Sequence, residues 1–208
     1  GKAPYPKMLR YLFLEMFGSI LTAPFYADSE FAYAQDCPSR GFPRKTAKRK
    51  DAVSRPTFST ESVNAMNFMT EAQAYEGEMR EFFEDLHRHP EPSHFEKRTN
   101  VRIREQLAAH DIDMLCPADN ITIAVIRGAQ PGKTIGLRFD TDALQMQELC
   151  DVPYKSEQDG LMHGCGHDAH TTCGVFVARL LQAHRDELCG TYKIIFQPAE
   201  EGEHGADE

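Results

Sequence analysis

The sequence contains no run of about eighteen apolar residues, the length that an α-helix needs to cross a bilayer. It therefore predicts no membrane-spanning segment. The six cysteines include no CxxC pair, and a chain of 208 residues is long enough to bury a core without the disulfides that stabilise short secreted domains. This pattern favours a reducing compartment, so we expect a cytoplasmic protein.

Positive charge is scarce in the larger part of the chain. Residues 71–208 carry 13 Lys and Arg against 26 Asp and Glu, whereas residues 1–70 carry 10 against 6. Proteins that bind nucleic acid rely on clustered Lys and Arg to neutralise phosphates. The acidic body therefore argues against a nucleic-acid partner.

The first 70 residues differ from the rest and are predicted to form an irregular, poorly ordered leader or linker. A mostly apolar stretch at residues 11–27 follows basic residues, and the small residues 32–34 could form a cleavage site, so a secretory signal stays an alternative. The basic run at residues 44–50 lies between prolines and is more typical of a solvated linker than of a binding patch. The folded domain is predicted to comprise residues 71–208.

Apolar residues at helical spacing predict three helices in this domain. The first carries Tyr75, Met79, Phe82, Phe83 and Leu86 and stops at HPEP, because proline cannot continue a helix. The second is expected to begin at Ser93, with Glu96 completing a capping box. The third is expected at residues 171–184. One side of the second helix should present Val101, Arg104 and Leu107.

Runs rich in β-branched residues predict the strands. Residues 121–128 and 134–140 are expected to form adjacent strands, joined through a turn at the Pro-Gly dipeptide between them, and residues 192–198 a further strand. The alternation of helices and strands predicts the α/β class, with a central sheet flanked by helices. In such sheets, functional residues gather where strands end and loops begin.

The segment HGCGHDAH, residues 163–170, is the first candidate site. Cys165 and His167 are separated by one glycine, and a thiolate and an imidazole on a tight loop can bind one divalent ion, with zinc, manganese, cobalt and nickel as candidates. By itself the pair is weak evidence, since Cys165 could be a buried apolar residue and His167 a helix cap. A thiol hydrolase is a poor alternative, because residues two apart on a tight loop seldom aim at each other.

Two adjacent glutamates, Glu200 and Glu201, form the second candidate site after the last strand. Neighbouring side chains diverge there, so one carboxylate can hold a metal while the other faces a metal-bound water and takes its proton. This division of roles is typical of amide hydrolysis. Considered alone, the pair is more simply a solvated acidic loop.

Asp140 and Asp142 form the third element, at the end of the strand 134–140. Residues two apart lie on one side of a strand, and a carboxylate there could accept the N–H of a metal-bound histidine and fix its tautomer. Aspartates at strand ends also form ordinary turns. Only the joint occurrence of the three elements is informative.

Three long segments, GKTIGLRFDTDALQMQE, PYKSEQDGLMHGCGHDAHTT and GTYKIIFQPAEEGEHGA, resemble the amidohydrolase branch of the aminoacylase and carboxypeptidase metallopeptidase superfamily. This branch includes hippurate hydrolases, N-acyl-amino-acid amidohydrolases and indole-acetyl-amino-acid hydrolases. The resemblance implies a zinc-peptidase-like catalytic domain with two divalent metal ions, hydrolysis of the amide bond of a small N-acyl amino acid, and a homodimer for the complete protein.

The resemblance also implies roles for individual residues. Cys165 matches a cysteine that bridges the metals, and His167 and Glu201 match metal ligands. Glu200 matches the general acid/base, and Asp142 the aspartate that orients the metal site. The remaining polar residues of the HGCGHDAH segment are expected to support the ligands or cap the helix: His163, Asp168 and His170.

The chain departs from the family pattern in three respects. Phe139 and Gln145 replace a small residue and a proline, since family members usually read RADMDALP where this chain has RFDTDALQ. His204 lies in a loop that is usually glycine-rich, and we expect it to face solvent. The pattern also requires two further metal-binding histidines and an inserted lid and dimerisation domain, none of which is found in the 208 residues.

The sequence thus predicts an N-terminal portion, truncated before the lid, that carries three of five ligands and by itself binds metal and turns over substrate poorly. The alternative is a catalytically inactive fragment that acts, if at all, as a weak metal-binding or partner-binding module.

Overall fold

The computed structural model describes residues 68–202 and 205–207. The predicted leader, its signal-like stretch and basic run, and His204 therefore lie outside the described residues, except that residues 68–70 open a helix. Within the described part of the chain, no helix is long and apolar enough to cross a membrane.

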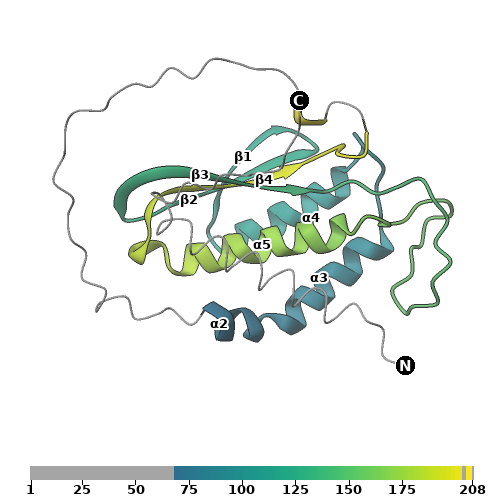
Figure 1. The fold of residues 1–208 in the computed structure, drawn as a ribbon, viewed down its shortest axis with the longest axis horizontal. Coiled ribbons are helices and arrows are strands. Elements are labelled where there is room, and N and C mark those ends of the chain that lie inside the picture. The colour runs from purple at the N-terminus through teal and green to yellow at the C-terminus, as the bar shows by residue number, and fades with distance from the viewer. Residues whose placement is uncertain (1–67, 203–204, 208) are drawn as a thin grey trace, which may run out of the picture.

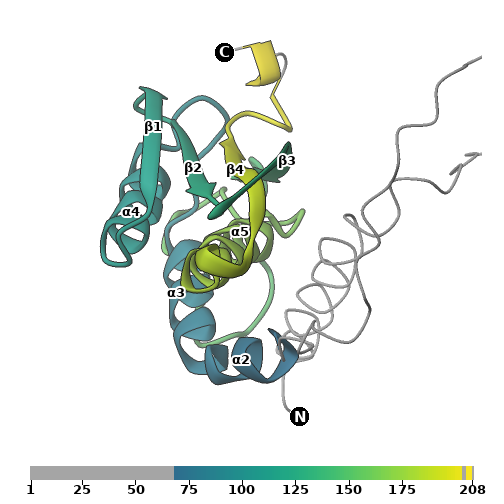
Figure 2. The same ribbon diagram turned by 90° about the vertical axis from the view of Figure 1, so that its left-hand side faces the viewer.

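A four-stranded sheet carries the described α-helices on one of its faces (Figures 1 and 2). This arrangement confirms the predicted α/β class. The elements in chain order are α2 (Phe68–Ala74), α3 (Glu76–Arg88), α4 (Lys97–Ala108), β1 (Asp113–Ala118), β2 (Ile121–Arg127), β3 (Gln130–Asp140), α5 (His167–Ala183) and β4 (Cys189–Gln197), with short 3-10 turns at Arg185–Glu187 and Gly205–Asp207.

The strand order β1-β2-β4-β3 shows that the prediction of β2 and β3 as neighbours was wrong. Strand β4 lies between them, antiparallel to β2 and parallel to β3. The link between β2 and β3 falls at residues 128–129, and the Pro-Gly dipeptide lies inside β3 rather than in a hairpin turn. A parallel pair needs a crossover, which α5 supplies between β3 and β4.

Parallel pairing of β3 with β4 brings two candidate loops to one edge of the sheet. Asp140 pairs with Gln197, so the chain leaves both strands side by side. Helix α5 begins at His167 rather than at Thr171, so its first turn lies at this same edge. Gly166, at φ 88°, adopts the left-handed conformation that lets the loop turn directly into the helix.

Helix α4 begins at Lys97 rather than at Ser93, so the predicted capping box was wrong. The first free amides, those of Arg98 and Thr99, donate instead to the two carboxylate oxygens of Glu91, at 2.9 and 2.7 Å. The expected apolar side was also wrong in part, because Val101 is 48% exposed. The buried residues of α4 are Thr99, Asn100, Ile103 and Leu107.

The core between α5 and the sheet contains the aromatic pair Phe139 and Phe196, with ring centroids 6.2 Å apart and neither side chain exposed. Gly174 of α5 lies against both rings. A Cβ atom at this position would come within 2.7 Å of Phe139 and 2.8 Å of Phe196. The glycine therefore provides the space for Phe139, which stands where the family pattern has a small residue.

Gly174→Ala tests this close packing. Alanine favours a helix by about 1 kcal/mol over glycine, but overpacking a core costs about 1–3 kcal/mol. Because both rings are fully buried, we expect a net loss of up to roughly 2 kcal/mol in the free energy of unfolding, measured by urea denaturation. Gly77→Ala in α3 is the matched control, since no atom lies within 4 Å of an added Cβ there. Equal stabilisation by both changes would contradict the packing argument.

Candidate metal centre

Three potential metal ligands converge at the edge where β3, β4 and α5 meet. The thiol sulfur of Cys165, a ring nitrogen of His167 and a carboxylate oxygen of Glu201 all lie within 4.8 Å of one another. The corresponding atoms of Asp140, His167 and Glu200 are equally close. A thiolate, an imidazole and a carboxylate form a donor set that fits zinc and the other divalent transition metals.

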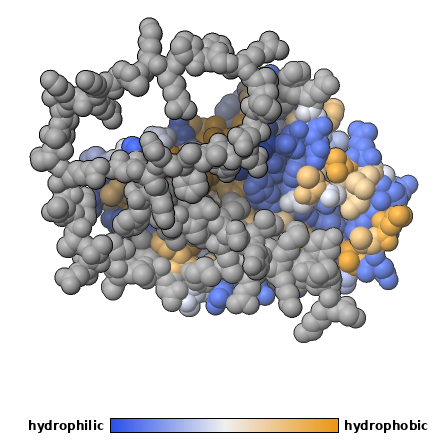
Figure 3. Space-filling model, in the orientation of Figure 1, coloured by the Kyte–Doolittle hydropathy of each residue, from blue (hydrophilic) through white to orange (hydrophobic). Residues whose placement is uncertain are grey.

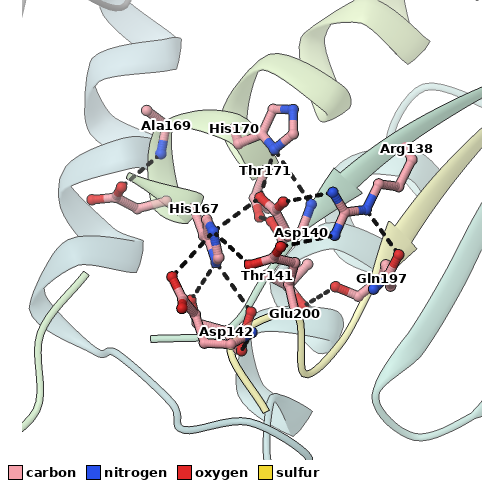
Figure 4. Close-up of polar contacts among 12 residues, drawn as sticks. Arg138, Asp140, Thr141, Asp142, His167, Ala169, His170, Thr171, Gln197 and Glu200 are labelled. Carbon is pink, nitrogen blue, oxygen red and sulfur yellow. Dashed lines mark hydrogen bonds and ion pairs between the residues drawn. The ribbon is translucent and has the colours of Figure 1, made fainter. Parts of the chain in front are cut away.

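His167 lies at the centre of the site, in the first turn of α5 (Figure 4). Its Nδ1 is 2.9 Å from the backbone oxygen of Asp142 and 3.0 Å from the Oδ1 of the same residue. Nδ1–H therefore donates to Asp142, and this tautomer leaves Nε2 free to bind a metal. Nε2 lies 3.8 Å from Glu200 and 4.0 Å from Glu201.

Asp142, just beyond the end of β3 and 1% exposed, connects His167 to the glutamate loop. Its Oδ2 accepts hydrogen bonds from the Ser93 hydroxyl at 2.7 Å and from the backbone N–H of Glu201 at 2.9 Å. Burial raises the pKa of Asp142, but the hydrogen bonds from His167, Ser93 and the glutamate loop outweigh burial and hold the pKa far below its usual value. Asp142 is thus ionised and can only accept hydrogen bonds.

A second buried carboxylate, Glu96, supports the glutamate loop. Ala199 immediately precedes the two glutamates and has φ 49°, in the left-handed region that residues with a Cβ disfavour. Its N–H donates to Oε1 of the fully buried Glu96 at 2.7 Å. Sequence reasoning missed this role because the S-x-x-E spacing of Ser93 and Glu96 indicated a capping box.

Asp140 is a further acidic residue beside His167. Its Oδ1 is 2.6 Å from Nδ1 of His170 and 3.5 Å from Nε2 of His167, and its Oδ2 is 3.2 Å from Arg138 (Figure 4). Burial raises the pKa of Asp140, but the hydrogen bond from His170 and the neighbouring positive charges lower it by more. Arg138 also lies 3.8 Å from Glu200. No spacing rule relates Arg138 to Glu200, so the sequence predicts no role for Arg138.

Acidic neighbours surround Cys165. A hydrogen bond with Glu201, burial and the charges of Glu201, Glu200 and Asp140 raise the pKa of the Cys165 thiol to about 11. Reactive cysteines have a lowered pKa, so these surroundings argue against a thiol nucleophile. They suit a divalent cation, which would replace the thiol proton and offset the carboxylate charges.

The other polar residues of the HGCGHDAH segment take different roles. His170 contacts Asp140, and Asp168 accepts a hydrogen bond from the Ala169 amide at 2.8 Å and contacts His87 of α3. His163 is buried, and neither of its ring nitrogens has a hydrogen-bond partner among the described residues. Burial lowers the pKa of His163.

Comparisons with known proteins agree with this geometry. Residues 136–208 match the profile of Peptidase family M20/M25/M40. An N-acetylcysteine deacetylase from Bacillus subtilis is 46% identical over 124 residues, which cover 59% of this chain and 33% of that protein. A hippurate hydrolase from Campylobacter jejuni is 34% identical over 142 residues, which cover 68% of this chain and 37% of that protein.

The similarity extends to three dimensions. The crystal structure of a dinuclear metal binding peptidase of the M20 family from Bacillus subtilis matches with a TM-score of 0.60 and 42% identity, over 62% of this chain and 37% of that chain. Fold and site together define a metallopeptidase-like α/β domain. Residues 136–208 are similar to peptidase family M20/M25/M40, as the resemblance implied. It spans about a third of the length of the relatives it matches.

Proposed function

We propose that this chain supplies metal-binding and proton-transfer residues of a metal-dependent amidohydrolase that removes the acyl group from an N-acyl amino acid or a similar small amide. The observation that carries the proposal is the convergence of Cys165, His167 and Glu201 within 4.8 Å, with Glu200 beside them. The names of the two relatives, an N-acetylcysteine deacetylase and a hippurate hydrolase, support this class of substrate.

Each residue then has a distinct task. Cys165, His167 and Glu201 hold a divalent ion, which when bound would polarise the amide carbonyl and acidify a water molecule. Asp142 keeps Nε2 of His167 directed at the ion by accepting from Nδ1. Glu200, with Oε2 3.8 Å from Nε2 of His167, takes the proton of the attacking water and passes it to the leaving nitrogen.

We extend the proposal to the whole site. Cys165, His167 and Glu201 would hold two divalent ions, zinc, manganese, cobalt or nickel, together with the two further histidines that the family resemblance implies. The complete protein is proposed to be a homodimer. A catalytically inactive module that binds metal or a partner weakly is the second candidate.

Metal content and hydrolysis, measured on the same purified chain, test the proposal. After dialysis against each of the four ions, elemental analysis is expected to find metal bound in proportion to the chain. Hydrolysis of N-acetylcysteine and hippurate is followed through the released amino group. Binding with turnover supports the amidohydrolase, while a folded chain that binds none of the ions contradicts it. Because the chain alone is expected to turn over substrate poorly, binding without turnover is followed by the same assay on a protein of the relatives' full length, in which absence of turnover favours the inactive module.

A further inference from the structure

A buried cluster of charged side chains lies next to the metal centre but outside it. His87, in the last turn of α3, has Nδ1 2.6 Å from Oδ2 of Asp168 and Nε2 3.2 Å from Oε1 of Glu148. None of the three side chains is more than 7% exposed. The candidate catalytic chemistry uses none of them.

Both ring nitrogens of His87 face carboxylate oxygens. An ionised carboxylate accepts hydrogen bonds but cannot donate them. The ring can therefore donate a hydrogen bond from each nitrogen only when it is protonated, as an imidazolium. Burial lowers the pKa of His87, but the hydrogen bonds and charges of Asp168 and Glu148 raise it by more. The rings of Tyr154 and Phe83, with centroids 5.3 and 5.7 Å away, pack against the imidazole. Charge-assisted hydrogen bonds in such dry surroundings are strong.

The two carboxylates belong to the segments that present the candidate ligands. Asp168 directly follows His167 in the first turn of α5. Glu148 lies in the connection between β3 and α5 that leads to Cys165, and its Oε2 accepts from the backbone N–H of Ser156 at 2.7 Å. His87 therefore ties α3 both to the start of α5 and to this connection.

Loss of the cation would leave Asp168 and Glu148 as like charges that share a buried space. A buried charge without its partner is strongly destabilising, so the two carboxylates would be driven apart. Movement of Asp168 displaces His167, because the two residues are adjacent. Loss of the cation would therefore disturb the position of the loop that carries Cys165 and His167.

We propose that His87 is a positioning residue, a buried cation that fixes the loop carrying Cys165 and His167. For its effect on metal affinity, this inference rests on the proposed metal-binding function. His184 offers a matched control, since it lies at the other end of α5 between Glu71 and Glu187, at 2.7 and 3.3 Å.

Hydrogen–deuterium exchange on the metal-free full chain tests the positioning directly. His87→Gln is expected to speed amide exchange about tenfold or more in residues 160–172, because local opening of the loop becomes easier. His184→Gln is expected to leave exchange in those residues unchanged. Equal exchange in the two variants would overturn the proposal whether or not the chain binds metal.

Cobalt titration against a competing chelator then tests the consequence for the metal centre. Residues that support metal ligands typically contribute 10–100-fold in metal affinity. We expect His87→Gln to lose cobalt affinity by this factor and to show a weaker thiolate-to-cobalt absorption band. His184→Gln is expected to keep the cobalt affinity of the unaltered chain. If the unaltered chain binds no cobalt, the proposed function fails, while the exchange result still decides the role of His87.

The double variant H87Q/E148Q separates positioning from a general loss of stability. It removes one of the two facing carboxylates, so it is expected to fold and to recover about tenfold of the lost cobalt affinity. A folded double variant with no recovery would overturn the argument from facing carboxylates. Circular dichroism at the assay temperature establishes folding for each variant.

Discussion

Glu200→Gln in the complete protein is expected to lower kcat for N-acyl amino acid hydrolysis by about 10²–10⁴-fold, the usual contribution of a general acid/base. Glutamine has nearly the shape of glutamate but cannot take a proton from water. Glu200 belongs to the second group, with Asp140 and His167, and lies outside the group of Cys165, His167 and Glu201 that we propose as the ligands. Its replacement should therefore leave metal content nearly unchanged. Steady-state kinetics and elemental analysis of the same preparation measure both quantities.

The matched control for this prediction is Glu187→Gln. Glu187 lies in the 3-10 turn after α5, at the opposite end of that helix from the site, so its replacement should leave both kcat and metal content unchanged. If Glu200→Gln loses metal together with activity, Glu200 is a ligand and the proposed proton-transfer role is wrong. Unchanged activity with unchanged metal would assign the general acid/base to another residue.

Cys165→Ala and His167→Ala are each expected to weaken metal binding by about 100-fold or more, a larger effect than that of an outer-shell change. The thiol and the imidazole are two of the three groups that converge within 4.8 Å. Chelator competition with zinc measures the affinity.

Cys150→Ala is the control for the cysteine change, because Cys150 is an exposed free thiol in the connection between β3 and α5. It should bind zinc as the unaltered chain does. Full metal stoichiometry and affinity in Cys165→Ala would contradict the ligand role of Cys165. That result would leave the group of Asp140, His167 and Glu200 as the alternative metal centre.

Several elements of the fold could be predicted because their signals are local. The apolar spacing of α3 and the β-branched runs of β2 and β4 identify those elements without reference to the rest of the chain. Strand β1 gave no such signal, since five of its six residues are exposed and it contains Pro117. The order of the strands depends on which of them pair, and spacing along the chain does not encode that pairing.

The start of α4 shows how a local signal can be overridden. Ser93 and Glu96 have capping-box spacing, yet the hydroxyl of Ser93 donates to Asp142 and the carboxylate of Glu96 accepts from Ala199. Glu91 takes over the capping of the helix. These partners lie far away in the sequence, so the competition between local and distant hydrogen bonds could not be decided from spacing.

The sequence by itself determined the chemical character of the candidate site. Cys165 and His167 are one glycine apart, and Glu200 and Glu201 are adjacent, so short backbone stretches fix each pair and the residue types limit what each can bind. Only the tertiary structure decided how these pairs meet. The parallel pairing of β3 with β4 places Asp142 between His167 and Glu201, and the packing of α3 places His87, 81 residues away in sequence, against Asp168. Such contacts depend on long-range packing of buried surfaces, which no short pattern in the chain specifies.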